Sequence, residues 1–246
     1  MYISIKNERS FPMKKKRIFL LSLLLNACFL IAGFGLVQRL GGPSYFWYRW
    51  KTKGRAVLYD HKISQFEFLA MDSSSIVFLG NSLTDQGNWQ EWLPEFSIAN
   101  RGISGDMTGG IYRRLDPILQ VQPKKIFLLI GINDLLFKNV QETFQQYEQI
   151  VEKILDESPT TSLYLQSLLP VNNEVRYTGI DNDQILALNT KIASLAMEKQ
   201  LSFINIHHEL KDEGGNLNDD YTLDGIHLNG LAYAKWVAIL KPYLEE

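Results

Sequence analysis

The sequence of 246 residues contains one cysteine, Cys28, which excludes a disulfide framework and a cysteine-based zinc site. It also lacks internal repeats and long low-complexity stretches. Hydrophobic residues make up 46% and charged residues 21%, so the composition is that of a globular protein. The length allows one large domain or at most two small ones.

Acidic residues are nearly absent from the start of the chain. Residues 1–55 contain 11 Lys and Arg and a single acid, Glu8, for a charge of +10. The remainder contains 14 bases and 26 acids, for a charge of −12. Because a domain of that charge repels phosphate backbones, nucleic acid is excluded as a partner of the folded part.

No charge occurs in residues 18–37, which directly follow the basic cluster Lys14–Arg17. Twenty residues in a helix extend about 30 Å, the thickness of one bilayer core. Ser22 and Asn26 are the polar residues of this run, too few for the polar face of a core helix. We therefore predict an uncleaved membrane anchor.

Two other interpretations of this segment remain open. A cleavable signal peptide would have a shorter apolar region, and Leu25–Cys28 would be the attachment box of a lipoprotein. The excess of basic residues before the segment predicts that residues 1–17 form a cytoplasmic tail. Residues 18–37 would then be the anchor, 38–59 an aromatic and basic linker, and 60–246 a folded domain outside the cytoplasm, periplasmic or at the cell surface.

After residue 60, short apolar runs alternate with segments of helical periodicity. The predicted strands are residues 76–79, 96–99, 125–130, 162–166 and 202–206. Such alternation is typical of an α/β protein with a parallel sheet covered by helices on both faces. In these sheets ligands bind beyond the carboxyl ends of the strands, so the residues that follow each strand deserve most weight.

Four polar segments follow these strands: 80–85 (GNSLTD), 100–106 (NRGISGD), 131–134 (GIND) and 224–227 (DGIH). Together with their order and spacing, they resemble the blocks of the SGNH or GDSL-type hydrolases, which are serine esterases and lipases. The resemblance covers about residues 76–240 and implies a three-layer α/β/α, flavodoxin-like fold with a five-stranded parallel sheet. Residues 102–108 (GISGDMT) are most similar to bacterial relatives of platelet-activating-factor acetylhydrolase subunits and to carbohydrate acetylesterases. Asn81 stands where the family usually has Asp.

The residues themselves fit serine catalysis. Ser82 lies where a strand gives way to a helical turn, so its hydroxyl is presented at the sheet edge. His227 has an acid three residues earlier, Asp224, which can hold Nδ1–H while Nε2 faces Ser82. The Ser82 N–H, the Gly102 N–H and the Asn133 side-chain amide are the predicted donors of an oxyanion hole.

The expected substrate is an acylated small molecule or a glycan, from which a short acyl group, most readily acetyl, is removed. A lysophospholipase or thioesterase of the same fold is the alternative enzyme, and a catalytically silent, membrane-anchored binding protein is the alternative from another class. The predicted substrate contacts are Trp89, Asn172, Arg176 and Tyr177. We predict no cofactor and no metal, because the adjacent His207 and His208 point to opposite sides and have no partner cluster. The sequence makes no prediction about the oligomeric state.

Overall fold

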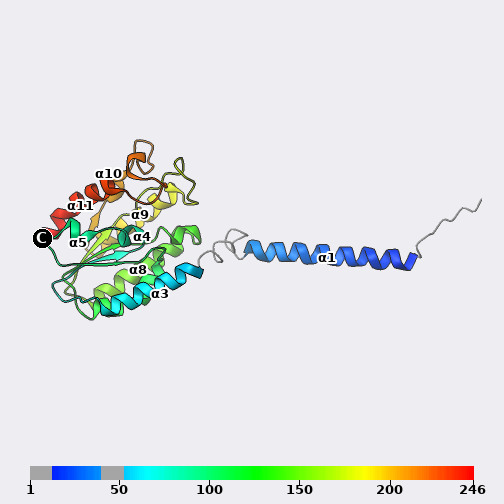
Figure 1. Cartoon of the computed structure of the whole chain (residues 1–246), viewed down its shortest axis with the longest axis horizontal. Coiled ribbons are helices and arrows are strands. Elements are labelled where there is room, and N and C mark those ends of the chain that lie inside the picture. Colours follow the sequence, from blue (N-terminus) through cyan, green and yellow to red (C-terminus); the bar gives the residue numbers. More distant parts are fainter. Residues whose placement is uncertain (1–12, 40–52) are drawn as a thin grey trace, which may run out of the picture. The chain divides into compact units, whose positions relative to one another are not determined.

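The computed structural model describes residues 13–39 and 53–246. The chain divides into two compact units, residues 1–54 and 55–246. The first contains α1 (Met13–Arg39), coloured blue in Figure 1. Within α1, the stretch Arg17–Gly35 has a mean hydropathy of 2.3, and its length and composition suit either a membrane span or a signal sequence. Most of the predicted tail and linker, residues 1–12 and 40–52, lies outside the described residues.

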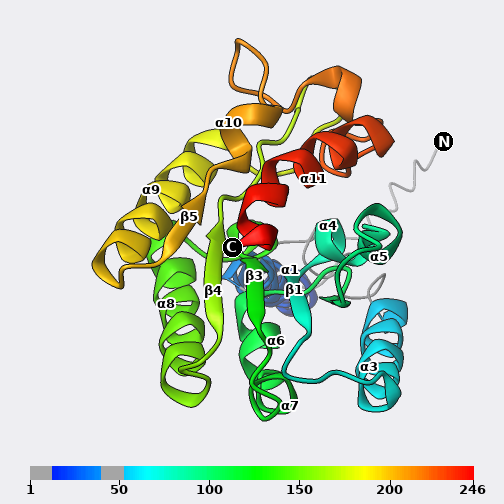
Figure 2. The same cartoon turned by 90° about the vertical axis from the view of Figure 1, so that its left-hand side faces the viewer.

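The division between the two units, after residue 54, falls inside α3 (Lys53–Phe68), and so does the predicted boundary at residue 60. Five strands follow in one sheet: β1 (Ile76–Gly80), β2 (Ile98–Gly102), β3 (Lys125–Leu129), β4 (Ser162–Gln166) and β5 (Ser202–Ile204). All neighbouring pairs are parallel, in the order β2-β1-β3-β4-β5, and Figure 2 shows β1, β3, β4 and β5 side by side. The predicted five-stranded parallel sheet is therefore confirmed.

The second strand differs from the prediction. It runs over Ile98–Gly102 and not over 96–99, because β1 pairs in parallel register with it as far as Gly80 opposite Gly102. The fifth strand is shorter than predicted, since Ile206 already belongs to a helix. Gly102 is thus the end of a strand and not part of the following loop.

Helices cover both faces of the sheet. One face packs on α6 (Thr108–Arg113), α7 (Asp116–Leu119), α8 (Val140–Glu157) and α9 (Asn182–Glu198). The other packs on α4 (Ser82–Asp85), α5 (Trp89–Trp92), α10 (Ile206–Leu210) and α11 (Gly230–Glu245). Two 3₁₀ turns, η1 (Asp134–Leu136) and η2 (Asp219–Tyr221), complete the described elements. The fold is the predicted three-layer arrangement.

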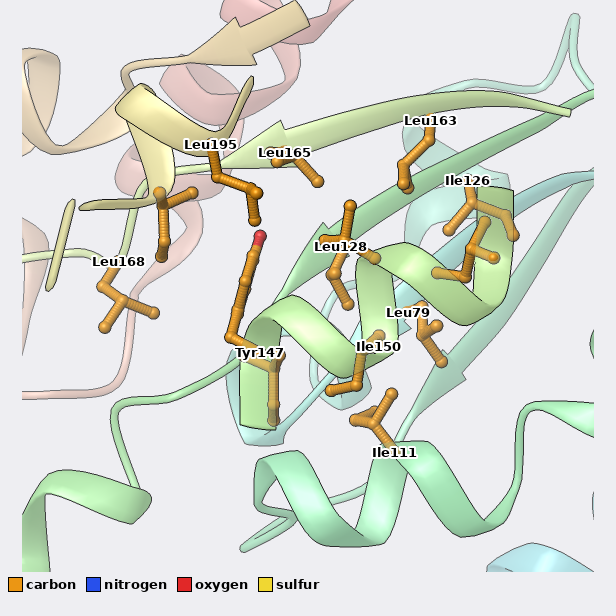
Figure 3. Close-up of a cluster of buried hydrophobic side chains, with 14 of the residues drawn as sticks. Leu79, Ile111, Ile126, Leu128, Tyr147, Ile150, Leu163, Leu165, Leu168 and Leu195 are labelled. Atoms are coloured by element: carbon orange, nitrogen blue, oxygen red, sulfur yellow. The ribbon is translucent and has the colours of Figure 1, made fainter. Parts of the chain in front are cut away.

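Apolar side chains of β1, β3 and β4 form the first core together with those of α6, α8 and α9 (Figure 3). The start of α8 is fixed by a capping box, in which the Asn139 side chain accepts from the Glu142 N–H and the Glu142 carboxylate accepts from the Asn139 N–H. Tyr147 of α8 lies in this core and is fully buried (Figure 3). Its hydroxyl has no hydrogen-bond partner within the described part of the chain.

Candidate active site

Ser82 is the first residue of α4, directly after β1, so its side chain lies at the carboxyl edge of the sheet. The preceding Asn81 is fully buried and caps the turn, since its Oδ1 accepts from the Leu83 N–H at 3.0 Å. Asn81 thus provides the same cap that an aspartate would provide. The first N–H groups of a helix have no intrahelical acceptor, which leaves the Ser82 N–H directed outward from the turn.

The structure brings the three predicted catalytic side chains together. His227 Nε2 lies 3.2 Å from Ser82 Oγ, and His227 Nδ1 lies 2.7 Å from Asp224 Oδ2. The side chains of His227 and Asp224 are 37% and 35% exposed, so the group is open to solvent. Hydroxyl, imidazole and carboxylate are therefore in line for proton transfer from Ser82 to His227.

The Asp224 carboxylate is held in its ionised form. Burial acts to raise its pKa, but hydrogen bonds from the His227 ring and from the N–H groups of His227 and Ile226 lower the pKa to about 2. Both N–H groups bind Oδ1, at 2.8 Å for His227 and 3.1 Å for Ile226. Oδ2 is thereby left to the imidazole, which fixes the orientation of the ring.

The loop that carries Asp224 requires a glycine. Gly225 has φ +81°, and a Cβ atom there would lie 2.3 Å from the Asn172 carbonyl oxygen. The Gly225 carbonyl accepts from the Asn172 N–H at 2.7 Å, and its N–H donates to Thr222 Oγ1 at 2.9 Å. The loop after β4 therefore packs closely against the backbone between Asp224 and His227 and supports both residues.

Asn133 follows β3 and reaches the loop after β2. Its Nδ2 donates to the Asp106 carbonyl at 2.8 Å, which leaves its second amide hydrogen for a ligand. The neighbouring Asp134 is buried and accepts from the N–H and the hydroxyl of Thr108, at 2.9 and 2.7 Å. These bonds join the second and third polar segments.

The structure does not support the predicted role of Gly102. Its N–H donates to Asn100 Oδ1 at 2.9 Å and so is already bound. A Cβ at Gly102 would lie 2.2 Å from the Asp85 backbone nitrogen, so this glycine serves the contact between β2 and α4. Gly105, three residues on, has φ +82°, and its N–H has no acceptor among the described residues. The sequence analysis missed Gly105, although it belongs to the same segment.

Two of the four predicted substrate contacts are structural residues. Trp89 is 1% exposed, stacks on Phe78 with ring centroids 4.4 Å apart, and donates from Nε1 to the Thr84 carbonyl. Asn172 is also buried, and its side chain binds backbone groups, the Leu217 carbonyl and the N–H groups at 174 and 175. Arg176 and Tyr177 are exposed on the loop that packs against Gly225. Among the described residues, no group of three or more His, Cys, Asp and Glu is arranged to hold a metal ion.

Comparison with known proteins gives a consistent result. The model of the GDSL-like Lipase/Acylhydrolase family matches residues 78–235. A candidate platelet activating factor from Streptococcus pneumoniae superposes with a TM-score of 0.68 at 28% identity, over 82% of this chain and 97% of that one. A GDSL-like lipase from Bacteroides thetaiotaomicron shares the fold, with a TM-score of 0.65 at 23% identity over 76% and 97% of the two chains.

One curated protein also matches. The N-acylneuraminate cytidylyltransferase of Escherichia coli O18:K1:H7 is 28% identical over 167 residues, which are 65% of this chain and 38% of that enzyme. The chain therefore spans less than half the length of this relative.

Proposed function

The chain belongs to the GDSL-like lipase/acylhydrolase family, and we propose that it is a serine ester hydrolase that removes short acyl groups through an acyl-serine intermediate. The observation that carries this proposal is the continuous line from Ser82 Oγ through His227 to Asp224. Ser82 Oγ attacks the acyl carbon while its proton passes to His227 Nε2. His227 then protonates the leaving alcohol, and water, deprotonated by the same nitrogen, releases the acid and restores Ser82.

The tetrahedral oxyanion needs hydrogen-bond donors that are in place before the reaction. We assign this role to the Ser82 N–H, the Gly105 N–H and the remaining amide hydrogen of Asn133. Gly105 replaces Gly102, whose N–H is bound to Asn100. The Asn133 amide lies beside the residue that follows Gly105, which supports a joint action of these two donors.

The proposed substrate is an O-acylated glycan or a related small molecule, with acetyl as the acyl group. An open triad suits a bulky, polar alcohol, because His227 and Asp224 are reached from solvent. The curated match to an enzyme named for a sugar acid also favours a sugar as the alcohol of the ester. A lysophospholipase or thioesterase would instead prefer long acyl chains or thioesters.

We further propose that α1 anchors the protein in a membrane and that the catalytic domain lies outside the cytoplasm. The apolar segment of α1 and the basic cluster Lys14–Arg17 before it support this orientation. External protease should then digest the domain in intact cells, or in spheroplasts where an outer membrane is present. Protection of the domain until the inner membrane is lysed would refute the orientation. Release by cleavage near Val37 would identify a signal peptide.

The activity is tested with p-nitrophenyl acetate, p-nitrophenyl palmitate and a panel of acetylated sugars. We expect hydrolysis of acetyl esters in preference to palmitate, and labelling of the protein by a fluorophosphonate probe. Ser82→Ala should abolish labelling. It should also reduce the rate of hydrolysis to about 10³ to 10⁴ times the uncatalysed rate in water, the enhancement that substrate binding and the remaining hydrogen-bond donors supply. Full activity of this variant would refute Ser82 as the nucleophile, and a wild-type protein without labelling would indicate a binding protein.

A further inference from the structure

Asp85, the last residue of α4, connects the nucleophile turn to two other segments. Its Oδ2 accepts from the Ser104 hydroxyl at 2.7 Å and from the Ser104 N–H at 3.2 Å. Its Oδ1 forms an ion pair with Lys62 Nζ of α3 at 2.7 Å. The carboxylate therefore lies between the helix that precedes the sheet and the loop that contains Gly105.

The backbone of Asp85 is itself held firmly. Its N–H donates to the Asn81 carbonyl at 2.9 Å, and its carbonyl accepts from Asn100 Nδ2 at 3.2 Å. Gly102 packs directly on the same backbone, since no Cβ fits between them. The Asp85 side chain thus extends from a fixed point three residues after Ser82.

The Gly105 loop is bound on both sides of the glycine. On one side, the Asp106 carboxylate pairs with Arg114 Nε at 2.9 Å, in a bridge whose side chains are 6% or less exposed. The Asp106 carbonyl also accepts from Asn133. On the other side, Ser104 is exposed and is held by Asp85. The Gly105 N–H belongs to the Ser104–Gly105 peptide, so the position of Ser104 sets the direction of this N–H.

We propose that Asp85 is a positioning residue for the oxyanion hole, which directs the Gly105 N–H by holding Ser104, and that Lys62 acts through Asp85. The inference rests on the proposed ester hydrolysis. Stabilisation of a developing oxyanion depends on donors that are already oriented, and small displacements of such groups are costly in rate. Asp85 gives Ser104 a charge-assisted hydrogen bond, the stronger type, without touching the substrate.

The test measures kcat and KM for p-nitrophenyl acetate in full-length variants. Asp85→Asn and Ser104→Ala should lower kcat about tenfold and change KM less than about twofold, because the loss arises in the transition state. Ser104→Thr keeps the hydroxyl and should restore most of kcat. A trifluoromethyl ketone, whose adduct with serine is a tetrahedral oxyanion, should lose affinity by the same factor as kcat/KM.

Lys62→Met should have a smaller effect, and the double variant with Asp85→Asn should be no slower than Asp85→Asn alone, since Lys62 acts only through that carboxylate. The matched control is Asp116→Asn, which breaks the ion pair of Asp116 with Lys153, also 2.7 Å long, at the surface of α7. Its kcat should equal that of the wild type.

Three results would overturn the inference. The first is that Asp85→Asn and Ser104→Ala have the same kcat as the Asp116→Asn control. The second is that these variants change only KM. The third is that their affinity for the trifluoromethyl ketone is unchanged. In each case an active wild type leaves the proposed function intact. A wild type that hydrolyses no ester of the panel overturns the proposed function and this inference together.

Discussion

Replacement of Asp224 by Asn should inactivate the enzyme through the tautomer of His227, and the local contacts explain why. Two backbone N–H groups, those of Ile226 and His227, donate to Asp224 Oδ1 at 3.1 and 2.8 Å. In the variant these N–H groups still need an acceptor, so the amide oxygen occupies the Oδ1 position. The amide nitrogen must then face His227 Nδ1, where the carboxylate oxygen lies at 2.7 Å in the wild type.

An amide that donates to Nδ1 stabilises the imidazole tautomer with its proton on Nε2. That nitrogen lies 3.2 Å from Ser82 Oγ and would then donate to the hydroxyl and be unable to accept its proton. The carboxylate charge that stabilises the imidazolium is lost as well. By analogy with serine proteases, kcat should fall by about 10⁴, with the fold unchanged.

The assay is steady-state hydrolysis of p-nitrophenyl acetate, with thermal unfolding measured on the same samples. Asp183→Asn is the matched control, because Asp183 is exposed in the first turn of α9. Nitrogen-15 chemical shifts of labelled histidine would report the tautomer directly. An Asp224→Asn enzyme with kcat within tenfold of the wild type would refute the reasoning, as would His227 carrying its proton on Nδ1.

Three further predictions concern pH, the oxyanion hole and the core. The pKa of Asp224, about 2, lies below its ordinary value of 3.8, so the stability that its ionised carboxylate contributes is fully present above about pH 4 and is lost as the pH falls toward 2; Asp224→Asn should remove this part of the pH dependence, and acid-unfolding curves between pH 4 and pH 2 that are the same for the variant and the wild type would contradict this. Asn133→Ala should lower kcat by about 10² to 10³ with little change in KM, and kinetics altered only in KM would place Asn133 in ground-state binding. Tyr147→Phe should stabilise the fold by about 1 kcal/mol and raise Tm by about 2 to 4 °C, because the buried hydroxyl has no partner among the described residues; a lower Tm would show that the hydroxyl is satisfied.

The sheet and the proximity of Ser82, His227 and Asp224 could be predicted from the sequence because their signals are local. Apolar runs of strand length mark the five strands, and the segments that contain Ser82 and His227 follow them at the edge where ligands bind. The parallel sheet brings those ends together without any knowledge of packing. The choice of Asp224 required only the spacing to His227, which the turn at Gly225 makes effective.

The glycine that we propose as an oxyanion donor could not be chosen in the same way. Gly102 and Gly105 lie in one segment and both are glycines, so composition does not separate them. What separates them is a side-chain contact, the bond from the Gly102 N–H to Asn100 Oδ1, together with the extension of β2 to residue 102. Trp89 is a related case, since the sequence alone does not reveal that its ring stacks on Phe78.

Helix α3 shows a second limit of sequence analysis, because several of its contacts with the domain are made by polar groups. The Tyr59 hydroxyl donates to the Gly110 carbonyl at 3.3 Å, and Lys62 pairs with Asp85. The Arg101 guanidinium lies 4.9 Å from the centre of the Phe66 ring and donates to the Leu69 carbonyl. Hydrophobic periodicity does not detect such contacts, and the linker predicted for residues 38–59 therefore includes the beginning of this helix. Since β2, α4 and α6 contribute the partners of Tyr59, Lys62 and Phe66, polar and cation–π contacts attach α3 to the elements around the proposed active site.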